Sequence, residues 1–205
     1  MRCFERWLRR ARVALSMTEG FHPKPRMNFL APLALGIEGL DEVLECDLAE
    51  VPTAEGLSRR LAEHAPPGWR LGAVDVLPEG SRRGRAVAFQ YRVELPEPPC
   101  PGLAERVERL LGADACEVSR DRNRKPLDIR PRIDWIRLDG RELSMRLLVA
   151  EGGEASPRHV LSALGLDEPT ATPIQRTAVE IDPGPRPGVA DRAAADRPLA
   201  GRPPA

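Results

Sequence analysis

The residues whose side chains are best suited to bind a ligand or to react lie together near the start of the chain. His22, Lys24 and Arg26 alternate with Pro23 and Pro25 in the sequence GFHPKPR. A histidine can serve as a general base near neutral pH, and neighbouring cations favour an anionic ligand such as phosphate. Because proline fixes its own φ and restricts the residue before it, the loop is expected to be stiff. We therefore take His22, Lys24 and Arg26 as candidate binding residues; the alternative is a surface histidine in a proline-stiffened loop.

A second basic cluster lies between residues 120 and 132 and is diluted by Asp121 and Asp128. Its members are Arg120, Arg122, Arg124, Lys125, Arg130 and Arg132. A charged turn between strands can contact phosphates, and we take Arg122, Arg124 and Lys125 as a second candidate contact. The commoner alternative is a solvated, charged hairpin.

No other residues form a convincing site. Tyr91 and Trp135 could stack on bases as sheet aromatics do, but both lie in apolar alternation and are expected in the core. His64 and His159 fall on expected helices with no ligand partner at metal spacing. No carboxylate pairs with a nucleophile, and no glycine-rich loop has phosphate-cradle spacing. We therefore expect no catalytic residue, no metal site and no cofactor.

Composition sets the remaining limits. The 205 residues carry 31 Lys+Arg and 31 Asp+Glu, and this balance argues against a polyanion binder that acts through bulk charge. No two of the four cysteines have metal-ligand spacing, so we expect reduced thiols in a cytoplasmic protein; they are Cys3, Cys46, Cys100 and Cys116. No apolar run approaches the roughly 20 residues that span a bilayer, and the N-terminus lacks the apolar core of a signal peptide.

The first part of the chain is expected to read helix, strand, strand, helix, strand. An apolar stripe predicts a helix over 2–14, and strands are predicted at 27–35 and 41–49, the first interrupted by Pro32. Thr53 is placed to cap a helix over 54–65, and a strand is predicted at 70–77. Gly36 and Gly39 are expected in a turn. One further strand before Met1 would complete a βαββαβ unit, so the first sheet is expected to lack its initial strand.

The second part is read as the full βαββαβ order. Strands are predicted at 86–95, 115–119, 132–138, 142–149 and 172–181, with helices near 103–111 and 157–164. Asp139-Gly140 is a hairpin signal, and Ser156-Pro157 is a helix start. The fold class is therefore α+β, with two tandem ferredoxin-like (βαββαβ) domains over 1–78 and 86–181. Residues 182–205, rich in Pro, Gly and Ala, are expected to form a disordered tail.

The stretch SMTEGFHPKPRMNFLAPLALGIEGLDEVLECDL resembles the signature of a bacterial radical-SAM-linked family, a domain of unknown function. The matching elements are residues 8–11, 19–26, 32–36 and 41–48, with a weaker D-I-R-P element at 128–131. Members of that family occur fused to or beside radical SAM proteins, near genes for a ribonuclease and ribosomal proteins. This chain has no cluster-binding CxxxCxxC, so the resemblance implies an accessory rather than the radical SAM enzyme itself. The family also begins with a strand and an SH-x-D-like element that this chain lacks.

We therefore expect a non-catalytic accessory or recognition module that acts with a radical SAM protein in RNA or ribosome-related modification. The expected partners are that protein and RNA, without DNA or a membrane. One alternative is a metal-independent endoribonuclease with His22 as its base, which rests on fold-level analogy. Another is a protein-interaction scaffold that uses the sheet edge left open by the missing strand.

Overall fold

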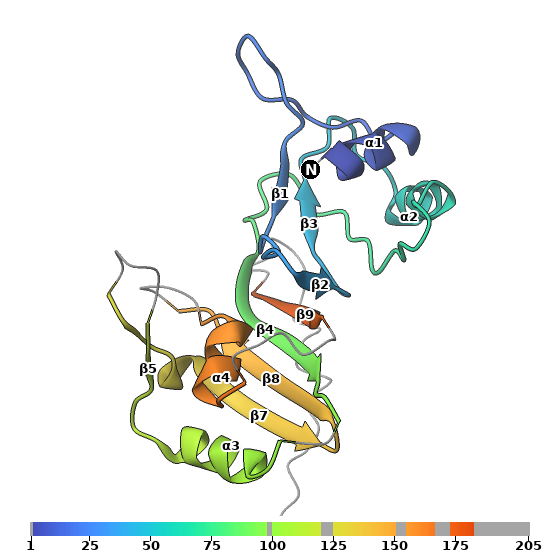
Figure 1. Ribbon diagram of the computed structural model, residues 1–205. Helices are drawn as coiled ribbons and strands as arrows, with labels where there is room; N and C mark the ends of the chain where they lie inside the picture. The colour runs from blue at the N-terminus through green and yellow to red at the C-terminus, as the bar shows by residue number, and fades with distance from the viewer. Residues whose placement is uncertain (1, 98–99, 120–124, 151–154, 167–172, 183–205) are drawn as a thin grey trace, which may run out of the picture.

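The computed structural model describes residues 2–97, 100–119, 125–150, 155–166 and 173–182 (Figure 1). Its centre is a five-stranded sheet in the order β2-β9-β4-β8-β7. The strands are β2 (Ile37–Gly39), β9 (Ile174–Asp182), β4 (Arg85–Glu94), β8 (Glu142–Leu148) and β7 (Ile133–Asp139). β2 runs parallel to β9, while every other neighbouring pair is antiparallel.

Alternation along the central strands decides which face of this sheet is buried. On β4, Phe89, Tyr91 and Val93 are buried, while Gln90 and Arg92 point to the opposite face. Their antiparallel partners on β8 continue both faces, since Phe89 lies across from Leu147 and Gln90 across from Arg146. Helices α3 (Leu103–Gly112) and α4 (Pro157–Ala163) pack their apolar residues against the first face and close the main core.

A second, smaller core gathers the N-terminal elements. It joins α1 (Arg2–Arg10), α2 (Ala54–Glu63) and an antiparallel pair, β1 (Met27–Phe29) with β3 (Leu44–Cys46). Trp7 and Leu8 of α1 meet Leu57 and Leu61 of α2. The indole Nε1 of Trp7 donates to the Leu61 carbonyl at 2.9 Å, so the ring is buried with its polar group satisfied.

The D-I-R-P element has a structural role. Strands β5 (Glu117–Val118) and β6 (Leu127–Asp128) pair and lead into a 3-10 turn, η1 (Arg130–Arg132). The Arg130 guanidinium donates to the Leu111 carbonyl at 2.7 and 3.1 Å and to the Ile133 carbonyl at 3.0 Å. Because Leu111 belongs to the last turn of α3, Arg130 satisfies a carbonyl that the helix itself leaves unpaired.

Several sequence predictions are confirmed. The class is mixed α+β. Thr53 caps α2 by accepting from the Gly56 N–H at 3.2 Å, and Ser156 caps α4 with Pro157 in its first turn. The Asp139-Gly140 hairpin joins β7 to β8, with Gly140 in the left-handed region at φ 55°.

Other predictions are wrong, and the tandem ferredoxin-like arrangement is not confirmed. No strand forms over 70–77; instead Leu71, Val74 and Val76 pack against the Trp7 core without a strand partner. The segment predicted as a turn around Gly36 and Gly39 contains β2, which pairs with β9. The first helix ends at Arg10 rather than at residue 14, and β1 and β3 are shorter than predicted. Asp182, the first residue of the predicted tail, is the last residue of β9, and the rest of that tail, from residue 183 onward, lies outside the described residues.

No helix among the described residues is long and apolar enough to cross a membrane.

Candidate functional site

Residues 16–26, called the arm below, fold back on themselves and project beyond α1 as the blue loop at the top of Figure 1. The Thr18 N–H donates to the Lys24 carbonyl at 2.8 Å, and the Arg26 N–H donates to the Ser16 carbonyl at 2.8 Å. The Lys24 N–H also donates to the Thr18 hydroxyl at 2.9 Å. At its base the Ser16 N–H donates to the Asp47 carbonyl, so the arm is anchored beside β3.

The arm presents an aromatic ring and its predicted cations to solvent. Gly20 lies at φ 116°, a backbone conformation that favours glycine, and directly precedes Phe21. Phe21 is fully exposed. His22, Lys24 and Arg26 are exposed as well. The Arg26 side chain makes a hydrogen bond within the arm, from its Nε to the Met17 carbonyl at 3.2 Å. The structure thus brings all three predicted residues onto one projection, together with Phe21, which the sequence reasoning did not select.

The arm continues a basic region that begins in α1. Among residues 2–26, seven side chains are basic and two acidic, a net charge of +5, whereas the whole chain has 31 of each sign. All seven are exposed: Arg2, Arg6, Arg9, Arg10, Arg12, Lys24 and Arg26. Within the described part of the chain, no carboxylate forms an ion pair with any of them. This region therefore concentrates positive charge that the fold does not neutralise.

The second predicted cluster is only partly described. Arg122 and Arg124 lie outside the described residues, and Lys125 is exposed. Backbone N–H groups of Cys116 and Arg130, at 2.8 and 3.1 Å, hold the pKa of Asp128 below its usual value, with help from nearby arginine charges. Asp128 and Arg130 thus organise the turn rather than offer a free binding surface.

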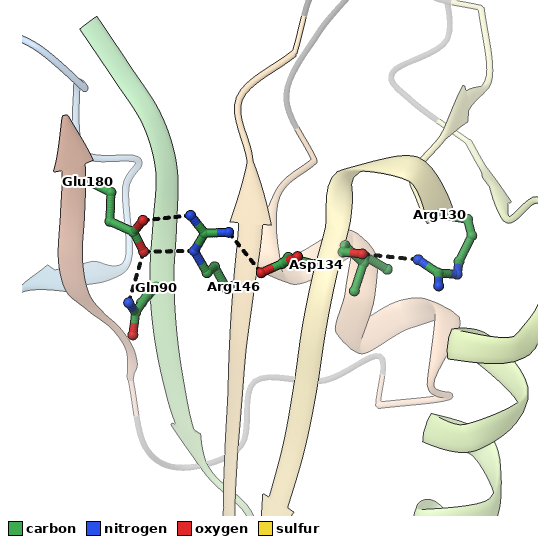
Figure 2. A network of polar contacts seen from close by, with 6 residues as sticks. Gln90, Arg130, Asp134, Arg146 and Glu180 are labelled. Atoms are coloured by element: carbon green, nitrogen blue, oxygen red, sulfur yellow. Dashed lines mark hydrogen bonds and ion pairs between the residues drawn. The ribbon is translucent and has the colours of Figure 1, made fainter. Parts of the chain in front are cut away.

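The sheet face opposite α3 and α4 carries arginines that are already paired. Arg146 lies between Glu180 and Asp134, with its Nη2 at 2.6 Å from Glu180 Oε2 and its Nη1 at 2.8 Å from Asp134 Oδ2 (Figure 2). Gln90 adds a hydrogen bond to Glu180 at 2.9 Å. Hydrogen bonding to Glu180 raises the pKa of Arg146, and the same bond lowers the pKa of Glu180.

The same face gives little room for base stacking. Tyr91 points to the opposite face and is buried, so its core assignment is confirmed. Trp135 is half-buried, and the Arg137 guanidinium lies 4.7 Å from the centre of its ring. Arg92 donates to Gln175 Oε1 at 2.8 and 3.1 Å. On this sheet face the charges of arginines and carboxylates therefore offset each other, whereas the positive charges of the arm and α1 have no carboxylate partner in the described part of the chain.

Other reactive groups are structural in the part of the chain that the structure describes. No three His, Cys, Asp or Glu side chains there gather into a metal-binding group. His159 Nδ1 accepts from the Ser156 N–H at 3.1 Å and completes the capping box of α4. The four cysteines are free. Burial, followed by the charges of Asp47 and Glu45, raises the pKa of Cys46 to about 11, so this thiol stays protonated at neutral pH.

Fold and site together define an α+β protein with a projecting basic arm and no recognisable catalytic group among its described residues. The family model described as "Uncharacterized protein conserved in bacteria (DUF2344)" matches residues 1–158, so the chain belongs to this family. Comparison with curated proteins and with solved structures found no match.

The Glu180 network predicts an acid-sensitive contribution to stability. Because the folded-state pKa of Glu180 is lowered, its contribution is complete above the unfolded value of 4.5 and is lost as pH falls through the folded value. Glu180→Gln should therefore lower the unfolding midpoint in urea at neutral pH and flatten its decline below pH 4.5. Glu55→Gln, at an exposed helix pair, is the control and should leave that decline unchanged. If the unfolding midpoint declined equally steeply with falling pH in Glu180→Gln and in the unsubstituted protein, the acid sensitivity would not come from Glu180.

Proposed function

We propose that this chain is a non-catalytic recognition module that holds an RNA-linked substrate for a radical SAM protein. The observation that carries the proposal is the basic region of α1 and the arm, whose seven exposed cations form no ion pair within the described residues. The resemblance of residues 16–48 to radical-SAM-linked proteins supports the choice of partner.

Charge and shape favour single-stranded RNA as the ligand. Lysine and arginine side chains on a narrow projection can contact successive phosphates, which gives affinity that depends on salt. A fully exposed aromatic such as Phe21 can stack on an unpaired base, but it cannot reach a base inside a duplex. The arm is held by its own backbone hydrogen bonds, so little conformational entropy is lost when it binds.

Binding of a labelled single-stranded RNA, measured by fluorescence anisotropy at several salt concentrations, tests the proposal. Removing two phosphate contacts with Lys24→Ala and Arg26→Ala should weaken binding and reduce the salt slope by about 1.4, since each contact to a single strand contributes about 0.7. Phe21→Ala should weaken binding by about 1–3 kcal/mol with the salt slope unchanged.

The matched control removes two exposed arginines from the elements that surround the main core, with Arg85→Ala on β4 and Arg109→Ala on α3. This variant should bind RNA like the unsubstituted protein. Absent or salt-insensitive RNA binding would overturn the proposal that the ligand is RNA. An equal loss of RNA affinity in the control variant would overturn it as well. Cleavage of the RNA that disappears with His22→Ala would show an enzyme instead. Capture of the radical SAM protein after ribonuclease treatment, without any RNA binding, would identify a scaffold.

A further inference from the structure

The end of α1 contains an unusual backbone conformation. Arg12 has φ 53°, and it is the one residue other than glycine with positive φ in the described chain. The Arg12 N–H donates to the Arg9 carbonyl and the Val13 N–H to the Leu8 carbonyl, both at 3.0 Å, as in a helix end that normally uses glycine. Placing a side chain here costs about 1–2 kcal/mol. A strained position of this kind calls for a reason in what the side chain does.

Arg12 lines a small open pocket together with Arg60 of α2. The Arg60 Nη1 donates to the Arg12 carbonyl at 3.1 Å, which places the Arg60 guanidinium against the main chain of Arg12. Glu50 also lines the pocket, and residues 13–14, 48 and 51–52 complete its walls. The pocket volume is about 70 Å³. One water needs about 10–15 Å³ by this measure, so the space suits one small ligand group.

We propose that this pocket binds a single phosphate group. Arg12 follows the end of α1 and Arg60 lies on α2, and two guanidinium groups can donate several charge-assisted hydrogen bonds to one tetrahedral oxyanion. A glycine at position 12 would relieve the backbone strain, but it would also remove the Arg12 guanidinium. A bound phosphate therefore explains why an arginine stands at this strained position. Glu50 opposes the anion and weakens its binding. The inference rests on the proposed function only where the phosphate belongs to RNA; free inorganic phosphate offers the same chemistry.

Titration with inorganic phosphate, against chloride at equal ionic strength and followed by the amide NMR signals of residues 12–14, tests the site. Arg60→Gln and Arg12→Gly should each raise Kd by about tenfold or more, as loss of a hydrogen bond to a charged group predicts. Arg12→Gly should unfold at no lower temperature than the unsubstituted protein, because glycine accepts the backbone conformation. Glu50→Gln should lower Kd. The matched control is Arg59→Gln, one residue along α2, which should leave Kd unchanged.

Each contrary result overturns the inference. If Arg59→Gln weakened phosphate binding as much as Arg60→Gln, the binding would depend on bulk charge. NMR shifts that grow linearly with phosphate and never saturate would show that there is no site. Unchanged Kd in a less stable Arg12→Gly protein would show a purely structural arginine. Phosphate that displaces single-stranded RNA, in an Arg60-dependent manner, identifies the RNA backbone as the source; saturable binding without displacement identifies free phosphate. Because Phe21→Ala and Lys24→Ala leave the pocket intact, retained phosphate binding in those variants separates this site from a failure of RNA binding by the arm.

Discussion

Replacing Arg176 with methionine is expected to lower the free energy of unfolding by about 3–5 kcal/mol, the usual cost of breaking a buried ion pair by removing one partner. Only 3% of the Arg176 side chain is exposed. Its Nε donates to Glu42 Oε1 at 2.8 Å, and its Nη2 donates to the Ala31 carbonyl at 2.7 Å and to Glu42 Oε2. Methionine fills much of the volume but leaves the Glu42 carboxylate and the Ala31 carbonyl without their partner.

Urea unfolding of three further variants separates this pair from a general effect of lost charge. Arg92→Met removes a half-exposed arginine from the other face of the sheet and should cost about 1 kcal/mol or less. Glu42→Gln alone should be destabilising, but Glu42→Gln combined with Arg176→Met should cost less than the two changes added, because they share one interaction. Additive costs, or an Arg176→Met cost as small as that of Arg92→Met, would contradict the assignment.

The Arg176 contact also shows where sequence reasoning stops. Glu42 and Arg176 are 134 positions apart, and no local pattern pairs them. The same holds for β2, whose three residues lie parallel to β9 and join the N-terminal segment to the main sheet. Apolar alternation does predict β4 and β8, because each strand buries one face, and the caps at Thr53 and Ser156 follow from local hydrogen bonding.

In the candidate site, too, some features can be predicted from local sequence and others depend on the folded structure. Two prolines and Gly20 are enough to predict a stiff loop that places His22, Lys24 and Arg26 together. The charge excess of residues 2–26 can also be counted from the sequence. The failed strand at 70–77 shows the limit, since Leu71, Val74 and Val76 are apolar but pack against an aromatic cluster without forming a ladder. The pocket between Arg12 and Arg60 depends on a backbone dihedral angle and on packing between α1 and α2, and neither has a sequence signal.

Trp7→Ala is expected to cost about 3–5 kcal/mol, as for other buried aromatic residues, and to affect mainly the N-terminal core. Trp7 is buried and donates to the Leu61 carbonyl at 2.9 Å. The centre of its ring lies 6.3 Å from that of Phe4 and 5.5 Å from that of Trp69. Among the described residues, the fully buried members of this cluster are Trp7, Leu8, Ala11, Leu57 and Leu61, with partly buried side chains around them. The main core includes residues from β4, β7, β8, β9 and both of their covering helices. So small a core cannot lose its largest side chain and keep its cooperativity.

Hydrogen exchange measured by segment distinguishes local from global loss in Trp7→Ala. Amides of α1, α2, β1 and β3 should exchange rapidly while those of β4 and β8 stay protected, because the two cores are built from different elements. Trp7→Phe, which keeps an aromatic ring but loses the hydrogen bond, should cost less and preserve protection in α1. Trp135→Ala, at a half-buried sheet position, is the matched control and should leave α1 protected. Equal loss of protection in β4 and α1 would show one cooperative unit, and the arm and the Arg12 pocket would then depend on the whole fold rather than on the small aromatic core beneath them.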